Sequence, residues 1–368
     1  MGLEPAGLPI LKVDSDDGLT YGALVELYQY GDGTRLPYRW TLQPRVEFST
    51  EGRRDVTLFI DAPHVLPEGW RVNGFLGIER LVVTPYFGLG NDTPYEESRE
   101  ASNGPNPNFY RFGSLRRSAI FNLQRRVAGS PLWGLFGAGL VSTRVDPFPE
   151  DEGTTLYATQ VSPEVDTYWT NYVRAGLIWD TRDRETAPRD GSWSEVVVHR
   201  VTESLGADVE FTRWSVIDRR YYSLSDELVF AHRYLLQGVS GDVPPEQLQR
   251  VQTSFKQGEG LGGSKTVRGL PRNRYAGEGM LVWNAELRLH VFDFRLVGRA
   301  FHVALSAFVD HGRVWAGGVR MQELFSDLHR GYGGGFHLGM GEDFVVSLDL
   351  AHSDQATLPF YIGLGYLY

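Results

Sequence analysis

The most concentrated group of residues able to do chemistry lies in one Gly-rich, basic segment, GEGLGGSKTVRGLPRNRYAGEG, residues 258–279. Such a loop can hold a phosphate group when its glycines follow the GxxxxGK(S/T) spacing and a helix comes next. Here the glycine spacing differs, and the residues that follow alternate in polarity like a strand. We therefore expect neither a nucleotide nor any other cofactor at this segment.

Metal-binding and hydrolytic residues show no better arrangement. The chain contains 9 His and no Cys, and no histidine stands in the HExxH spacing of a zinc site. The GxSxG segment that presents a nucleophilic serine in many hydrolases does not occur either. The sequence thus predicts no metal site and no catalytic residues, and we expect the protein not to be an enzyme.

Charge and hydropathy narrow the class of protein. The net charge of −10 disfavours nucleic acid as a partner, because no basic surplus is available to neutralise phosphates. Mean hydropathy is −0.27, and no run of about 18 apolar residues marks a transmembrane helix. A membrane-spanning β-barrel fits such an average, because its strands alternate lipid-facing apolar residues with lumen-facing polar ones.

Alternation with a period of two is the dominant pattern, and it is clearest in residues 279–293. One face carries Leu281, Trp283, Ala285, Leu287, Leu289 and Val291, and the other carries Asn284, Glu286, Arg288 and His290. In a soluble sandwich the apolar face would be core, whereas in a barrel it would meet lipid.

Strands assigned in this way make the chain all-β, with about sixteen strands. Many exceed ten residues, which suits a tilted membrane-spanning strand of about nine to eleven residues better than a soluble one. The predicted fold is a single transmembrane antiparallel β-barrel over residues 19–368, preceded by a short periplasmic segment, residues 1–18. The predicted strands are 20–30, 37–50, 53–61, 70–79, 81–90, 109–127, 132–144, 167–181, 192–203, 207–223, 226–239, 279–293, 299–316, 330–340, 343–353 and 358–368.

The connections alternate between short turns and long loops, as they do at the two rims of a membrane barrel. The long ones cover residues 91–108, 146–166 and 241–278, and Gly341–Glu342 is one of the short ones. The last long loop precedes the twelfth predicted strand, and we expect it to fold into the lumen with Arg268. A buried arginine needs carboxylate partners, and Glu286 and Asp310 are the inward-facing candidates on the strands that follow.

Several segments resemble the BamA superfamily of outer-membrane assembly barrels, which includes the bacterial surface antigen family. LGGSKTVRGLPRNRY resembles the loop motif of that superfamily, and NAELRLHVF and AFVDHGRVW resemble its next two strands. GLIWDTRDRETAPRDGSWSEV and PYFGLGND resemble two further segments, so the resemblance covers most of the chain in the same order.

The resemblance implies that Val267, Arg268 and Gly269 form the tip of the inward-folded loop, with Arg268 paired to Asp310 near Glu286. It also implies a weakly paired lateral seam between the first and last strands. On these strands the seam residues would be Tyr21, Leu24, Phe360, Ile362, Leu364, Tyr366 and Tyr368. The last five alternate outward and would form part of an aromatic girdle.

The sequence departs from the family pattern at two places. Leu270 stands where an aromatic residue often follows the Arg-Gly of the motif. Residues 1–18 are too few for even one periplasmic POTRA module, so either such modules were removed or this is a barrel-only member. The same segment lacks the basic and apolar regions of a signal peptide, which we expect to have been removed.

The expected function is protein assembly or translocation in the bacterial outer membrane, with the lumen closed by residues 258–279. The expected partners are outer-membrane lipid and, further, other outer-membrane proteins or periplasmic factors, but not nucleic acid. One alternative is a barrel-only pore or a structural scaffold in a membrane complex. A barrel phospholipase is a second, although no strand shows a convincing outward Ser-His pair.

Overall fold

The computed structural model of the chain describes residues 2–14, 18–32, 38–100, 106–149, 153–255, 258–341 and 344–368. Several sequence predictions include residues outside these ranges. They are the N-terminal segment 1–18, the long loops 91–108, 146–166 and 241–278, the turn at Gly341–Glu342, and the strands predicted at 37–50 and 343–353.

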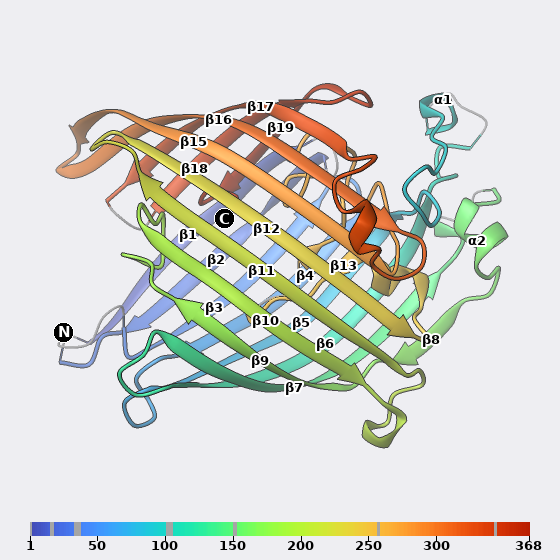
Figure 1. Ribbon diagram of the computed structural model, residues 1–368, viewed down its shortest axis with the longest axis horizontal. Helices are drawn as coiled ribbons and strands as arrows, with labels where there is room; N and C mark the ends of the chain where they lie inside the picture. The colour runs from blue at the N-terminus through green and yellow to red at the C-terminus, as the bar shows by residue number, and fades with distance from the viewer. Residues whose placement is uncertain are drawn as a thin grey trace.

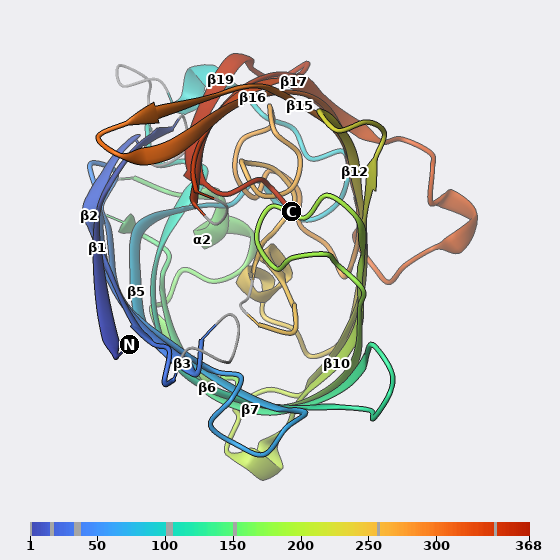
Figure 2. The same cartoon turned by 90° about the vertical axis from the view of Figure 1, so that its left-hand side faces the viewer.

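The wall of the molecule is a 17-stranded antiparallel sheet in which each strand pairs with the next strand of the wall, except that β8 and β9 both pair with β7. The sheet curves into a barrel around an interior that holds further chain (Figures 1 and 2). Its strands are β1 (Leu3–Asp14), β2 (Gly18–Gln29), β3 (Trp40–Ser49), β4 (Arg53–Ala62), β5 (Trp70–Pro85), β6 (Arg111–Arg126), β7 (Leu132–Asp146), β8 (Asp166–Trp169), β9 (Tyr172–Asp180), β10 (Gly191–Val201), β11 (Phe211–Ser223), β12 (Leu228–Gly241), β15 (Gly279–Leu296), β16 (Arg299–Trp315), β17 (His329–Met340), β18 (Phe344–His352) and β19 (Thr357–Leu364).

β8 and β9 pair with successive parts of β7, so together they form a single passage along the wall. The 17 strands of the sheet therefore make sixteen passages. The predicted all-β barrel of about sixteen strands is confirmed, but two of its strands were misplaced. The predicted strands 70–79 and 81–90 are one strand, β5, and the first passage is β1, in a segment that we expected to precede the first strand.

Both misplacements have a physical reason. The charged residues Glu79 and Arg80 lie where the prediction divided the strand, but Glu79 accepts a hydrogen bond from Arg116 of β6 at 3.1 Å and the strand continues past it. β1 contains Pro5 and Pro9, which argue against a strand because proline lacks an N–H. Strands at the edge of a sheet tolerate proline, and β1 is fully paired only with β2.

The period-two alternation of the sequence reappears as two faces of the wall. On β15, Leu287 and Leu289 are exposed on the outer face, while Asn284, Glu286 and Arg288 are buried on the inner face. Apolar residues outside and charged residues inside are the reverse of a soluble barrel and match a lipid-facing wall.

The helices and the longer loops gather at one end of the barrel (Figure 1). They include α1 (Glu97–Glu100), α2 (Leu156–Gln160) and the 3-10 turns Glu203–Leu205 and Met321–Glu323. No helix among the described residues is long and apolar enough to cross a bilayer. The opposite end carries short turns such as Val297–Gly298 between β15 and β16.

The last residues of the chain differ from the prediction of a strand to residue 368. β19 ends at Leu364, and Gly365 adopts a φ of 76°, a left-handed conformation that glycine tolerates. The chain then turns into the lumen, where Tyr368 is buried and its hydroxyl donates to the Ala231 carbonyl at 3.0 Å. Tyr366 and Tyr368 are therefore not outward girdle residues, because the left-handed turn removes them from the wall.

Candidate functional site: a loop held inside the barrel

The chain between β12 and β15 lies inside the ring of strands (Figure 2). It contains the 3-10 turn Pro245–Gln249 and a two-stranded ribbon of β13 (Arg250–Val251) and β14 (Gly258–Glu259). We call residues 260–275, which follow this ribbon, the lumen loop. Its position explains why the segment is rich in both glycine and polar residues: it must bend sharply and pack against a polar inner wall.

Glycines give the lumen loop its shape. Gly262 has a φ of 110°, and a Cβ there would come within 2.0 Å of the Pro271 carbonyl oxygen. Thr266 closes the bend, because its hydroxyl donates to the Gly260 carbonyl at 2.7 Å and accepts from the Gly262 N–H at 2.8 Å. Val267 is fully buried.

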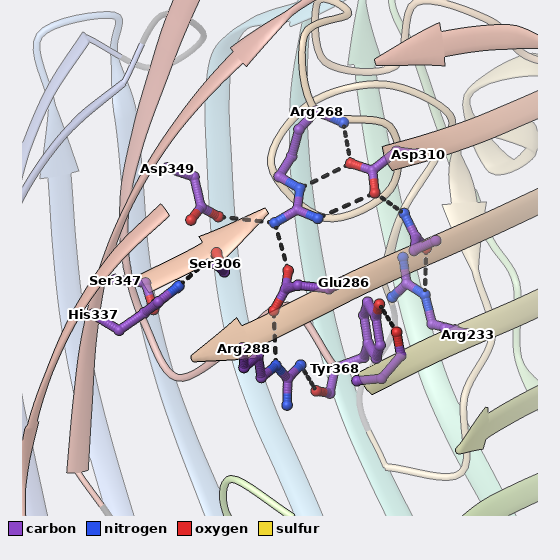
Figure 3. A network of polar contacts seen from close by, with 12 residues as sticks. Arg233, Arg268, Glu286, Arg288, Ser306, Asp310, His337, Ser347, Asp349 and Tyr368 are labelled. Carbon is purple, nitrogen blue, oxygen red and sulfur yellow. Dashed lines mark hydrogen bonds and ion pairs between the residues drawn. The ribbon is translucent and has the colours of Figure 1, made fainter. Parts of the chain in front are cut away.

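Arg268 is the centre of the site, and three carboxylates surround it (Figure 3). Its Nε and Nη2 donate to the two oxygens of Asp310 on β16, at 2.8 and 3.1 Å. Its Nη1 donates to Glu286 on β15 at 3.0 Å and to Asp349 on β18 at 3.1 Å. The guanidinium also lies over the ring of Phe308, with 3.3 Å between its central carbon and the ring centroid.

The charge balance at this point favours a permanent cation. Burial alone would lower the pKa of Arg268, but the nearby carboxylates of Asp310 and Glu286 hold that pKa well above its usual value. Arg268 is 1% exposed, so its charge has little water to solvate it. Removal of either side of such a buried pair is costly, because the other charge remains without compensation.

The wall is shaped to let the loop backbone approach. A Cβ at Gly331 on β17 would lie 1.7 Å from the Arg268 carbonyl oxygen, and one at Gly312 on β16 would meet Leu261 at 2.3 Å. The Gly269 N–H donates to the hydroxyl of Tyr361 on β19 at 3.1 Å. The loop tip is thus fixed against the last strands of the wall as well as against β15 and β16.

The network extends from Arg268 towards the end of the chain (Figure 3). Glu286 accepts a hydrogen bond from Arg288 at 2.8 Å, and Arg288 in turn donates to the Tyr368 main-chain oxygen at 2.9 Å. On the other side of Asp310, Asn284 donates to its carboxylate at 2.8 Å. A continuous chain of polar contacts therefore connects the loop, the wall and residues 365–368.

The structure brings together the predicted loop residue Arg268 and both predicted acids. Sequence reasoning missed Asp349, although it lies on the inward face of an alternating strand, VVSLDLAH, and the same rule would have found it. It also missed Tyr361 and the inward turn of Tyr368, for which the sequence offers only Gly365 as a signal.

The predicted seam residues are distributed differently. Phe360, Ile362 and Leu364 lie on β19, which meets β1 at the register pair Asp14↔Tyr361. Tyr21 and Leu24 lie on β2, one strand away from that junction, because β1 precedes them in the wall.

A second polar contact holds the 3-10 turn Pro245–Gln249, which precedes the lumen loop. Glu246 is buried and accepts a hydrogen bond from the Tyr157 hydroxyl of α2 at 3.0 Å. Burial raises the pKa of Glu246 to about 7, even though this hydrogen bond opposes the shift. This contact titrates in the neutral range, unlike the permanent charge of Arg268.

No group of three or more His, Asp or Glu side chains in the described part of the chain is arranged to hold a metal ion. The charged side chains of the site bind each other, and the arrangement can hold a loop against the inner wall of the barrel.

Comparisons with known proteins show which proteins share this fold. A comparison with curated proteins finds no match. Among solved structures, BamA from Haemophilus ducreyi lacking POTRA domains 1–3 is similar, with a TM-score of 0.62 and 14% identity over 99% of this chain and 70% of that one. CdiB from Escherichia coli has a TM-score of 0.59 and 11% identity, over 100% of this chain and 63% of that one.

CdiB from Acinetobacter baumannii follows, with a TM-score of 0.51 and 13% identity over 99% of this chain. The chain spans 59% of that structure, so it is considerably shorter than either CdiB. At these identities the likeness shows the fold alone, an antiparallel β-barrel. The model of the Omp85 superfamily domain matches residues 41–366, which is most of the wall and the whole lumen loop, and the chain therefore belongs to the Omp85 superfamily.

Proposed function

We propose that this barrel assembles or translocates other proteins at the outer membrane, and that it does so by opening between β1 and β19. The junction of these strands carries the proposal. Among the described residues they share one register pair, Asp14↔Tyr361, whereas β1 is paired with β2 from Leu3 to Asp14. Beyond Tyr361, β19 continues to Leu364 without a registered partner on β1, so backbone groups on both strands remain available to another strand.

The interior of the barrel reaches this junction. A cavity of about 560 Å³ is lined by Ile10 and Leu24 on one side of the junction and by Ile362 and Leu364 on the other. Lys265 of the lumen loop lines the same cavity. A client strand entering at the junction would therefore have space on the inner side of the wall.

Tyr361 connects the junction to the lumen loop. It is the register partner of Asp14, and its hydroxyl accepts the hydrogen bond from Gly269, next to Arg268. Opening of the junction would therefore disturb the tip of the loop. The mechanism is physical: lipid cannot hydrogen-bond an open strand edge, so the edge is satisfied by a client strand.

A cross-link across the junction tests the proposal. The chain contains no Cys, so the pair Asp14→Cys and Tyr361→Cys would place the only thiols at the register pair. With the variant in vesicles, we expect oxidation to abolish its acceleration of outer-membrane barrel folding, and reduction to restore it. The reduced protein controls for the lost Tyr361 hydroxyl.

A matched cross-link keeps the test specific. Val196→Cys and Val216→Cys join β10 to β11 at an intact register pair with both side chains on the outer face. This disulfide should leave activity unchanged. Full activity of the oxidised Asp14–Tyr361 variant would rule out opening at this junction.

The lumen cavity also favours a second candidate, a passive pore. Planar-bilayer conductance separates the two functions. A closed assembly barrel should show small, flickering currents that increase when Arg268→Ala releases the loop. A large, steady conductance of the unmodified protein would favour the pore.

A further inference from the structure

The hairpin of β15 and β16 extends beyond its neighbour β12. In the described residues, pairing with β12 stops at Leu289, after which β15 continues for seven residues to Leu296 with β16 as its partner. We call residues 290–303 the rim ribbon. Its turn, Val297–Gly298, lies at the end of the barrel opposite α1 and α2, the end with the short turns (Figure 1).

A β-bulge changes which face each residue of the rim ribbon occupies. Before it, Leu289 is opposite Leu305, and both are exposed on the lipid-facing side. The register then shifts between His290 and Phe292, which leaves Val291 as an extra residue. A shift of one residue moves every following side chain to the other face of a strand.

The shift places the aromatic residues outside. Phe292 is opposite Val303 and Phe294 is opposite Phe301, and these β16 residues are on the same face as Leu305. Without the bulge, Phe292, Phe294 and Leu296 would continue the lumen-facing series of Glu286 and Arg288. With it, they extend the apolar outer face of the wall beyond the rim of β12.

The ribbon is amphipathic and strongly exposed. Val297 is 94% exposed and Leu296 58%, and the rings of Phe294 and Phe301 stack 5.2 Å apart. Asp293, opposite His302, lies on the other face. Arg295 and Arg299 are exposed beside the turn. A ribbon of this kind has an apolar face that water solvates poorly and cations next to it.

We propose that the rim ribbon lies in the headgroup layer of the periplasmic leaflet, with its aromatic face towards the acyl chains and Arg295 and Arg299 towards lipid phosphates. Short turns mark the periplasmic rim of such barrels. The apolar face is continuous with the lipid-facing wall, which identifies lipid as the occupant. The free edge of β15 needs water or headgroups, so the ribbon lies at the interface and not in hydrocarbon.

A strand from another protein is the competing occupant. It would pair with the free edge of β15, but strand addition covers the edge and leaves the aromatic face exposed. The inference is independent of the proposed opening between β1 and β19, since it concerns neither strand.

Depth-dependent quenching tests the placement. Because the chain has no Cys, Val297→Cys can be labelled alone with an environment-sensitive fluorophore in the full, folded barrel. Leu287→Cys on the lipid-facing wall and Leu205→Cys on the opposite rim serve as the membrane and water references. In phosphatidylcholine vesicles we expect the label at 297 to be quenched by headgroup-level nitroxide lipid, and the label at 205 to remain unquenched.

Substitutions separate the contribution of the aromatic face from that of the two arginines to the membrane contact. Phe292→Ser with Phe294→Ser should return the label at 297 to the behaviour of the label at 205. Phe325→Ser, which alters an exposed ring on the opposite rim, should not. Adding phosphatidylglycerol should strengthen the quenching of the label at 297. The double variant Arg295→Gln with Arg299→Gln should abolish this increase, and the control variant Arg320→Gln should preserve it. Each variant is first checked for a folded barrel by its heat-modifiable migration.

A label at 297 that behaves like the label at 205 in every vesicle overturns the proposal. Protection that requires an added periplasmic protein also overturns it and identifies a partner strand instead. If phosphatidylglycerol has no effect on the unmodified ribbon, the assignment of the two arginines to lipid phosphates is wrong.

Discussion

Asp310 accepts three hydrogen bonds from Arg268, two from the guanidinium and one from the main-chain N–H at 3.1 Å. The carboxylate therefore fixes both the side chain and the backbone at the tip of the lumen loop.

Replacement of Arg268 should release the loop. Arg268→Ala removes the cation that Asp310, Glu286 and Asp349 share, and among the described residues only Glu286 keeps another, Arg288. Loss of one partner from a buried pair costs about 3–5 kcal/mol. We expect the amides of the lumen loop to lose most of their hydrogen-exchange protection. Exchange protection in Arg268→Lys should lie between that of Arg268→Ala and that of the unmodified protein, since an ammonium cannot make the two-pronged contact with Asp310.

The control is a double-mutant cycle of Arg268→Ala, Asp310→Ala and the two changes together. The double variant should lose less stability than the sum of the two single variants, because it removes one of the uncompensated charges. Exchange protection of Arg268→Ala at the level of the unmodified loop would contradict the role given to the arginine.

Space at Gly331 should be as important as charge. A Cβ there would lie 1.7 Å from the Arg268 carbonyl oxygen, which is main chain and cannot move alone. Gly331→Ala should therefore displace the loop without removing any of the four charged side chains. Gly363→Ala is the matched control, because its added Cβ meets no described atom within 4 Å.

Exchange measurements on the lumen loop check this steric prediction too. Loss of protection in Gly331→Ala but not in Gly363→Ala is the expected pattern. Equal effects would mean that the loop responds to the stability of the strands and not to its close approach.

The hydroxyl of Tyr361 should contribute less than Arg268 to holding the lumen loop. Tyr361→Phe leaves the buried Gly269 N–H without its acceptor, a loss of about 1–3 kcal/mol. We expect faster exchange at Gly269 and its neighbours, with the Arg268 contacts retained. Tyr332→Phe on the exposed face of β17 should change nothing.

Contact between the 3-10 turn Pro245–Gln249 and α2 should depend on pH. Burial raises the pKa of Glu246 to about 7 from a usual value of 4.5, so the docked state holds its proton more tightly than the released one. The stabilising effect of this proton is complete below pH 4.5, declines as the pH rises to about 7, and is lost above that. Exchange of the amides at 245–249 should therefore be better protected at pH 5 than at pH 8.

Glu246→Gln supplies the control, since an amide does not titrate. Its protection should be the same at both pH values after correction for intrinsic exchange. A difference as large as that of the unmodified protein would assign the pH dependence to another group.

The sequence predicts some parts of this structure and not others. Alternation placed Glu286 and Asp310 on the inner wall correctly, because a period of two leaves only two faces to choose from. It did not reveal that β1 is a strand, since Pro5 and Pro9 are compatible with pairing only on one side. It also continued past Gly365, because nothing in the alternation of Phe360 to Tyr368 marks the left-handed turn.

The lumen contacts of Arg268 join parts of the chain that are made at different times. Its partners lie 18, 42 and 81 residues further along, and Gly269 depends on a residue 92 positions away. Contacts of such sequence separation form late, after the intervening strands have lost their freedom. A chain that stalls before β18 would hold Arg268 with one acid missing and Gly269 with no acceptor. Complete docking of the loop therefore requires that β18 and β19 have already joined the wall.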